Sequence, residues 1–389
     1  MAENIVILSP HFPPHYHRFW LQLKLAGGRA LGIGDAPEGE IAPEVRTALT
    51  EYRAVGDLHD YDALVRACGW YTHRFGKIER FESLNEYWLE TEARIREDFN
   101  IPGPRPAEIE RVRRKSRMKE VFRAAGLPTA PGRRAGSLEE ARAFAAEVGY
   151  PLVAKPDAGV GARNTHGIES EAGLAALFTA QPDEEWFLEA FVVGELHSFD
   201  GLADREGRPL FTTAHVFSQG ILETVREGRD LFYYSLREIP PGLEEAGLRS
   251  VSAFAVRERF FHIEFFHTAD GAWVPLEINL RPPGGWTTDM FNYSADADIY
   301  RAWAELLVRG ETALPPRRLY HCGYCSRRRN RRYAHTHNDV ISRYGHHILQ
   351  VEAVPPVLSG PLGDTGYLFR SPSLEQLHDI ARFIQQPAG

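Results

Sequence analysis

Two glutamates in the second half of the chain have a spacing that suits a bound cation. Glu264 and Glu277 flank Asp270-Gly271, a dipeptide that favours a two-residue hairpin turn. That turn places the two glutamates directly opposite each other. Asn279 and Arg281 then follow on the same face of the second strand. Opposed carboxylates repel each other unless a cation lies between them, and Mg²⁺ accepts carboxylate and amide oxygens, so this face is a candidate metal site.

The rest of the hairpin supports this interpretation but leaves a simpler one open. The same turn pairs Ile263 with Ile278 and Phe265 with Leu276, which makes the opposite face apolar. Arg281 can hold a phosphoryl or carboxylate group through two hydrogen bonds. The alternative is an edge hairpin with a solvated acidic face, which is common in antiparallel sheets.

Lysine is rare in this chain, because only five of the 45 basic residues are lysines. Lysine is a compact charge on a flexible stem, which suits a phosphate group. Lys155 ends an apolar stretch and precedes Gly159 and Gly161, whose backbone amides can turn toward an anion. A plain turn is the alternative, since the loop is neither a Walker A motif nor a dinucleotide fingerprint. Lys115 lies in a helix predicted over residues 107–125, and three lysines have no predicted role: Lys24, Lys77 and Lys119.

In their order along the chain, these segments resemble the ATP-grasp superfamily, to which biotin carboxylase, D-alanine–D-alanine ligase and the L-amino acid (dipeptide) ligases belong. Glu264 followed by Glu277-Ile-Asn279-Leu-Arg281 is similar to the magnesium signature of that superfamily. The resemblance implies that Glu264, Glu277 and Asn279 hold one or two Mg²⁺ ions with ATP, with Mn²⁺ as a possible substitute. It also implies that Arg281 is a catalytic residue near the reacting phosphate or the substrate.

The resemblance also supplies a nucleotide site and a substrate site. The implied ATP-binding residues are Lys115 and Lys155 at the phosphates, the backbones of Glu189 and Val192 at the adenine, and Glu195 at the ribose. Asn85 and Glu86 lie in a segment that resembles part of the substrate site in such proteins. The alternative for that segment is helix capping by Ser83 or Asn85.

The implied activity is ATP-dependent ligation of a carboxylate and an amine through an acyl phosphate, with release of ADP and phosphate. The expected partners are a small carboxylate substrate and a small amine substrate, and we expect both to be amino acids. Two alternatives stay open at this point. One is a carboxylation through carboxyphosphate, as in biotin carboxylase, and the other is a nucleotide-binding protein without turnover.

The elements predicted around these residues give an α/β fold in three parts. The first hundred residues alternate short apolar strands with amphipathic helices, which favours a parallel sheet covered by helices. Proline-rich breakers near residues 101–106 and 314–316 mark two boundaries. We therefore expect a Rossmann-like parallel-sheet domain over 1–106, an ATP-grasp α+β module over 107–313 and an α+β extension over 314–389.

Composition excludes several classes of protein. The formal charge of −8 argues against a general nucleic-acid binder, and no apolar run is long enough to span a membrane. The first residues predict a strand and not a signal peptide. Three cysteines are too few for a disulfide scaffold, so we expect a cytoplasmic protein, with a homodimer as a possible assembly.

A cluster near the C-terminus has three interpretations. Cys322 and Cys325, together with His335 and His337, are candidate zinc ligands, although their spacing is not that of a standard zinc finger. The arginines of 327–332 are a candidate RNA-binding patch. The favoured interpretation is a strand that packs beside the nucleotide module, with arginines that pair with surface acids.

Overall fold

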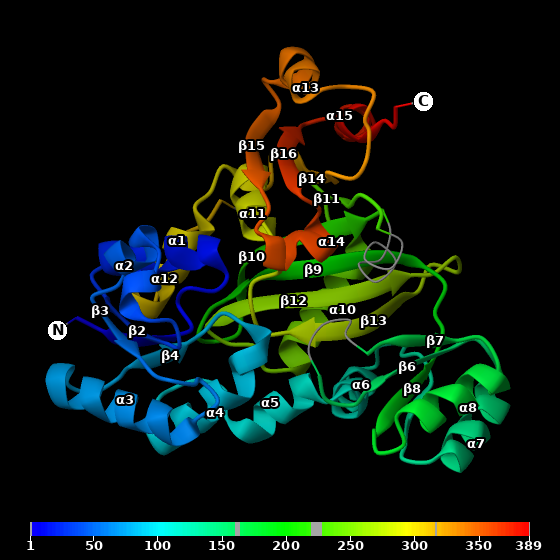
Figure 1. Cartoon of the computed structure of the whole chain (residues 1–389), viewed down its shortest axis with the longest axis horizontal. Helices are drawn as coiled ribbons and strands as arrows, with labels where there is room; N and C mark the ends of the chain where they lie inside the picture. Colours follow the sequence, from blue (N-terminus) through cyan, green and yellow to red (C-terminus); the bar gives the residue numbers. More distant parts are fainter. Residues whose placement is uncertain (1, 160–163, 219–227, 316, 389) are drawn as a thin grey trace.

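The computed structural model describes residues 2–159, 164–218, 228–315 and 317–388 of the chain. Figure 1 shows three sheets in these residues. The N-terminal unit, in blue, lies at the left, and a small sheet covered by α7 and α8 lies at the lower right. A large sheet runs from the centre toward the C-terminal helices at the top.

The N-terminal unit is built on the predicted parallel sheet, with strand order β3-β2-β1-β4. Its central strand β1 is buried along its whole length, which suits a parallel strand covered on both faces. The strands are β1 (Asn4–Leu8), β2 (Arg29–Gly34), β3 (Glu51–Ala54) and β4 (Arg80–Glu82), and the helices are α1 (His17–Leu25), α2 (Pro43–Ala48), α3 (Tyr61–Phe75) and α4 (Leu89–Asp98).

The small sheet is antiparallel, with strand order β5-β8-β6-β7. Its apolar side chains pack against α7 and α8 in a core of their own. It carries Lys155 on β6 and Glu189 on β8. Its elements are β5 (Gly132–Ala135), α7 (Leu138–Val148), β6 (Leu152–Pro156), β7 (His166–Ile168), α8 (Glu171–Ala180) and β8 (Trp186–Ala190).

The large sheet has the order β13-β12-β9-β10-β11-β14-β16-β15 among the described residues. Antiparallel pairing of β11 with β14 carries this sheet across residue 314 into the C-terminal part. Its strands are β9 (Glu195–Ala203), β10 (Pro209–Phe217), β11 (Phe232–Ser235), β12 (Arg259–His267), β13 (Trp273–Asn279), β14 (His321–Arg327), β15 (Ile348–Ala353) and β16 (Thr365–Ser371).

Helices cover this sheet and connect it to the other units. Phe199, Phe261 and Ile263 on one face pack in a single core with apolar residues of α6 and α10. Helix α12 packs against α1 of the N-terminal unit. The remaining helices are α5 (Pro106–Arg113), α6 (Lys115–Ala124), α10 (Pro241–Ala253), α11 (Thr287–Ala295), α12 (Ile299–Arg309), α13 (His337–Tyr344), α14 (Ser359–Leu362) and α15 (Leu374–Gln385).

The hairpin between β12 and β13 does not have the expected two-residue turn. The chain reverses over Thr268–Gly271, where the Gly271 N–H donates to the Thr268 carbonyl (2.9 Å) and Gly271 has a φ of +85°. Glycine therefore follows the turn centre instead of occupying it, which is the arrangement of the longer hairpin loops. The prediction of a turn centred on Asp270-Gly271 is wrong.

The longer turn changes the strand register only locally. Phe265 pairs with Pro275 and not with Leu276, so this part of the predicted pairing is also wrong. An irregularity between Glu264 and Phe265 then shifts the register by one residue. The predicted pairing of Glu264 with Glu277 is confirmed, because the two shifts cancel at that position.

The single helix expected over residues 107–125 is two helices. Arg114 has an extended backbone (φ −95°, ψ 120°) and forms an isolated bridge with Ala158. Helix α6 therefore begins at Lys115. The break lets the first turn of α6 bond to the loop that follows Lys155.

The C-terminal cluster follows the favoured interpretation. Cys322 and Cys325 lie in separate apolar cores, as expected for strand residues three positions apart. Among the described residues neither cysteine belongs to a group of three or more His, Cys, Asp or Glu side chains that could share a zinc ion, so the zinc interpretation is wrong for these residues. Arg327 lies over the rings of Tyr333 and Tyr367, and Arg331 pairs with Asp230 at 3.3 Å.

No helix in the described part of the chain is both long enough and apolar enough to cross a membrane.

Candidate functional site

The predicted metal ligands lie together on one face of β12 and β13. Glu264 stands opposite Glu277, and Asn279 donates a hydrogen bond from Nδ2 to Oε1 of Glu277 (3.3 Å). Burial raises the pKa of Glu277 to about 7, and the negative charges of Glu264 and Glu86 add to that shift. A cation bound between the carboxylates would offset this repulsion, so the residues present fit the predicted ion.

A buried ion cluster lies beside these carboxylates. Lys155 Nζ is 2.8 Å from Oε2 of Glu189, and Lys119 Nζ is 2.5 Å from Oε1 of the same side chain. Lys119 also donates to the carbonyl of Pro275 on β13 (2.9 Å). Burial raises the pKa of Glu189, but the two lysines more than offset this effect and lower it. Lys119, which had no predicted role, is thus part of this cluster. The scarcity of lysine is the signal in the sequence that could have drawn attention to it.

Lys115 is placed by the break between α5 and α6. Its N–H donates to the carbonyl of Asp157 (2.8 Å), and the Ser116 N–H and hydroxyl donate to the Asp157 carboxylate at 2.8 and 3.0 Å. The carboxylate thereby caps the N-terminus of α6, where negative charge is stabilised. Burial lowers the pKa of Lys115, and the nearby Glu277 opposes that shift.

Arg281 joins the large sheet to the N-terminal unit. Its Nη2 donates to Oε2 of Glu86 at 3.2 Å, and Arg113 Nη1 lies 3.8 Å from Oε1 of the same carboxylate. Burial lowers the pKa of Arg281, but Glu86 more than offsets that effect and raises it. The structure therefore brings the predicted catalytic arginine and one predicted substrate residue into direct contact.

The other predicted residues lie in a helix cap, after β8, at the start of β9 and in the loop after β6. The Asn85 side chain accepts from the Tyr87 N–H (3.0 Å) and caps a short helix, as the alternative for this segment stated. Val192 follows β8, and Glu195 begins β9 with an exposed side chain. Gly159 is described, whereas Gly161 of the predicted phosphate loop lies outside the described residues.

A buried polar network behind Glu264 had no signal in the sequence. His262 hydrogen-bonds through Nδ1 to Asp200 and through Nε2 to Oε1 of Glu264 (3.2 Å). Asp200 also bonds to the Ser198 hydroxyl and to Nδ1 of His215 (2.7 Å). Burial lowers the pKa of His262, but Asp200 and Glu264 more than offset this and raise it to about 10.

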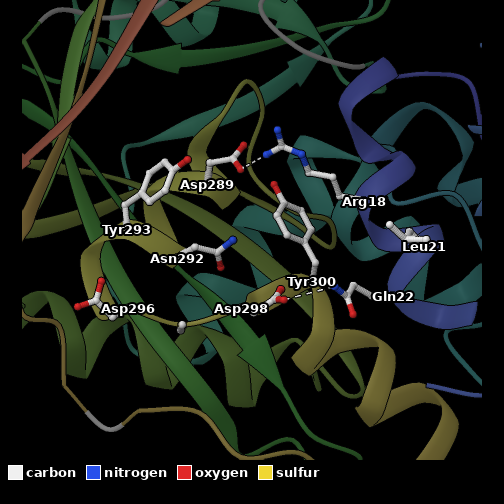
Figure 2. A pocket seen from close by; sticks show the side chains of 10 residues that line it. Arg18, Leu21, Gln22, Asp289, Asn292, Tyr293, Asp296, Asp298 and Tyr300 are labelled. Carbon is white, nitrogen blue, oxygen red and sulfur yellow. Dashed lines mark hydrogen bonds and ion pairs between the residues drawn. The ribbon is translucent and has the colours of Figure 1, made fainter. Parts of the chain in front are cut away.

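A cavity of about 530 Å³ lies between α1 and the segment that runs from α11 to α12 (Figure 2). Its acidic side chains are already engaged, since Asp289 pairs with Arg18 and Asp298 caps α12 through the Arg301 N–H (3.0 Å). Its lining contains none of the predicted site residues. The cavity therefore adds no group to the cluster around Glu264 and Glu277.

Known proteins resemble this chain at two levels, in the sequence of one segment and in the structure of nearly the whole chain. The family model of the carbamoyl-phosphate synthase L chain ATP binding domain matches residues 114–193, which include Lys115, Lys155 and Glu189. The L-amino acid ligase from Bacillus licheniformis has a similar structure, with a TM-score of 0.76 over 98% of this chain and 96% of that protein, at 15% identity. The chain has the ATP-grasp fold.

Other proteins with this fold have different chemistry in their names. The biotin carboxylase domain of the Hydrogenobacter thermophilus 2-oxoglutarate carboxylase, in complex with MgADP, ADP and bicarbonate, has a TM-score of 0.69 at 18% identity over 100% of this chain and 91% of that one. N5-carboxyaminoimidazole ribonucleotide synthetase from Thermus thermophilus has a TM-score of 0.69 at 17% identity, over 99% of both chains.

A curated relative matches only part of this chain. It is the uncharacterized protein y4rH of Sinorhizobium fredii (strain NBRC 101917 / NGR234), 38% identical over 110 residues. The match spans 28% of this chain and 22% of that protein.

The cap on α6 leads to a first prediction. Asp157→Ala removes both bonds to Ser116, and we expect the free energy of unfolding to fall by about 1–2 kcal/mol in urea denaturation. ATP affinity, measured by calorimetry, should also fall, because Lys115 begins the helix that this carboxylate caps. The control is Asp60→Ala, which removes the cap of α3. An equal loss of ATP affinity in both variants would contradict a local role for Asp157.

The buried lysine pair leads to a second prediction. Lys119→Met leaves Glu189 with Lys155 alone and leaves the Pro275 carbonyl without that donor, so we expect a loss of about 1–3 kcal/mol in the free energy of unfolding. Lys24→Met is the matched control, since Lys24 is exposed and its ammonium group donates to the Thr47 carbonyl at the surface. Equal urea midpoints for the two variants would show that the Lys119 pair contributes nothing.

Proposed function

We propose that the chain is an ATP-dependent carboxylate–amine ligase that releases ADP and phosphate. The observation that carries this proposal is the pairing of Glu264 with Glu277 on a strand face beside Lys115 and Lys155, both of which are buried. Two half-buried glutamates beside two buried lysines suit a nucleotide whose phosphates are bound with a divalent cation.

The reaction requires two steps at this site. A carboxylate oxygen of the first substrate attacks the γ-phosphorus of ATP, the bond to ADP breaks, and an acyl phosphate forms. The nitrogen of the second substrate then attacks the acyl carbon, phosphate leaves, and the nitrogen loses its proton. Neither step needs a covalent bond to the protein, so catalysis rests on positioning and on stabilising charge.

The roles of the residues follow from their charge and their place. Lys115 and Lys155 neutralise phosphate oxygens, and Glu189 with Lys119 fixes the position of Lys155. Glu264, Glu277 and Asn279 would hold Mg²⁺, which stabilises charge on the phosphates when bound. Arg281, held by Glu86, is placed to contact the transferred phosphoryl group or the acyl phosphate.

The remaining roles carry over from the resemblance. The backbones of Glu189 and Val192 would contact the adenine, Glu195 would hold the ribose, and Asn85 would lie near the substrate. The reactants that we expect are small carboxylates and amines, above all amino acids. The L-amino acid ligase among the similar structures supports this choice.

A screen of ADP release against amino acids, singly and in pairs, tests the proposed reaction. We expect ADP release only when an acid and an amine are both present. Release that depends on bicarbonate and not on an amine would favour carboxylation through carboxyphosphate. ATP binding without turnover for any pair would favour a nucleotide-binding protein.

The metal assignment is tested by Glu277→Gln, which keeps the size of the side chain and removes its charge. We expect ADP formation to be abolished while the circular dichroism spectrum stays unchanged. Glu206→Gln is the control, since that carboxylate is exposed and pairs only with Arg208 among its described ion pairs. Activity retained in Glu277→Gln would overturn the assignment.

The lysine assignments lead to a further prediction. Lys115→Arg or Lys155→Arg replaces a compact ammonium by a larger planar group in a buried position, so we expect ATP use to fall by about tenfold or more. Lys24→Arg and Lys77→Arg, at exposed positions, should change ATP use little. The comparison is made by steady-state kinetics, and equal effects at all four positions would contradict it.

A further inference from the structure

The buried network of Ser198, Asp200, His215 and His262 forms a chain of hydrogen bonds that ends at Glu264. Its side chains lie on one face of three adjacent strands, because His262 stands opposite Asp200 and Glu264 stands opposite Ser198 in the pairing of β12 with β9. On the next strand, β10, His215 stands opposite Ser198. The network therefore runs across the sheet and ends at a carboxylate of the proposed cation site.

The central histidine bonds to two acids at once. Nδ1 contacts Asp200 and Nε2 contacts Glu264, and a carboxylate oxygen can only accept a hydrogen bond. Each ring nitrogen therefore has one carboxylate partner, which gives the imidazole a single orientation between β9 and β12. Asp200 is fully buried and His262 is 7% exposed, so water does not compete for these hydrogen bonds.

We propose that Asp200 and His262 are positioning residues that orient the Glu264 carboxylate toward Glu277. This inference rests on the proposed cation-binding role of the two glutamates. A free glutamate opposite a second one would rotate away, because the two charges repel and its side chain has several rotamers. The bond from His262 to Oε1 fixes the side chain and leaves Oε2 for a cation.

Asp200 is itself fixed from the opposite side. The Ser198 hydroxyl and Nδ1 of His215 both bond to Oδ2, so the Oδ1 atom that meets His262 has one orientation. This is the arrangement of an outer-shell carboxylate–histidine pair, here directed at a carboxylate ligand and not at the metal.

The test compares cation affinity in the ADP-bound protein, with Mn²⁺ as the probe and electron paramagnetic resonance as the measurement. We expect His262→Gln to weaken Mn²⁺ binding by about tenfold or more, as outer-shell changes do. ADP affinity without any divalent cation, measured in EDTA by calorimetry, should stay within about twofold, since the pair acts through Glu264 alone.

Matched variants separate positioning from general damage to the sheet. Thr213→Val alters a buried residue that stands opposite Asp200 on β10 and whose hydroxyl has no hydrogen-bond partner among the described residues. It should leave Mn²⁺ binding unchanged. Asp200→Asn should reproduce the effect of His262→Gln, and it serves as the second variant where His262→Gln does not fold.

A double variant gives the decisive comparison. His262→Gln combined with Glu264→Gln should bind Mn²⁺ no more weakly than Glu264→Gln alone, because the histidine acts through that carboxylate. Additive losses would overturn the inference, and so would wild-type Mn²⁺ binding in both His262→Gln and Asp200→Asn. No effect of Glu264→Gln would instead overturn the cation role of the glutamates, and with it the inference. Failure of the ligase reaction alone would leave these binding results unaffected.

Discussion

The antiparallel register of β12 between β9 and β13 is the constraint on which the rest of the site depends. Because side chains alternate along a strand, this register sends Phe261, Ile263 and Phe265 into the core and turns Glu264 and His262 to the opposite face. A shift of one residue would exchange the two sets. The same pairing that buries the apolar residues therefore fixes where the charged ones meet.

Helix α6 joins this face to the small sheet. Its first turn is capped by Asp157 from the loop after β6, and Lys119 one turn later contacts both Glu189 of β8 and the Pro275 carbonyl of β13. The small sheet, which carries Lys155 and Glu189, and the β12–β13 face, which carries Glu264 and Glu277, are thus connected by buried polar contacts. Such contacts are directional, so they set the position of the sheets relative to each other more strictly than apolar packing does.

The N-terminal unit is joined to the large sheet in a similar way. Glu82 at the end of β4 accepts from Arg259 of β12 (2.9 Å) and from Arg96 of α4 (3.1 Å), and all three residues are buried. Glu86, a few residues further along, bonds to Arg281. The unit therefore contributes a charged group to the site as well as a surface that covers it.

Several features could be predicted because they depend on local patterns. The buried run at residues 5–8, the parallel sheet and the alternation that sets Glu264 and Glu277 on the face opposite Ile263 and Ile278 follow from hydrophobic periodicity. The pairing of Glu264 with Glu277 was predicted from a turn that does not form, and it holds because two register shifts cancel. The errors were local as well. The turn at Thr268–Gly271 and the break at Arg114 depend on single backbone angles, which residue preferences do not determine.

The sequence by itself determined the class of fold and the set of acidic and basic residues that could meet a nucleotide, because residue type and spacing carry that information. Only the tertiary structure decided which groups are partners. The pairs of Lys119 with Glu189, Asp200 with His262 and Glu86 with Arg281 each join residues that are at least 62 positions apart. Contacts at such separations arise when strands pair and helices pack, and no local pattern in the sequence records them.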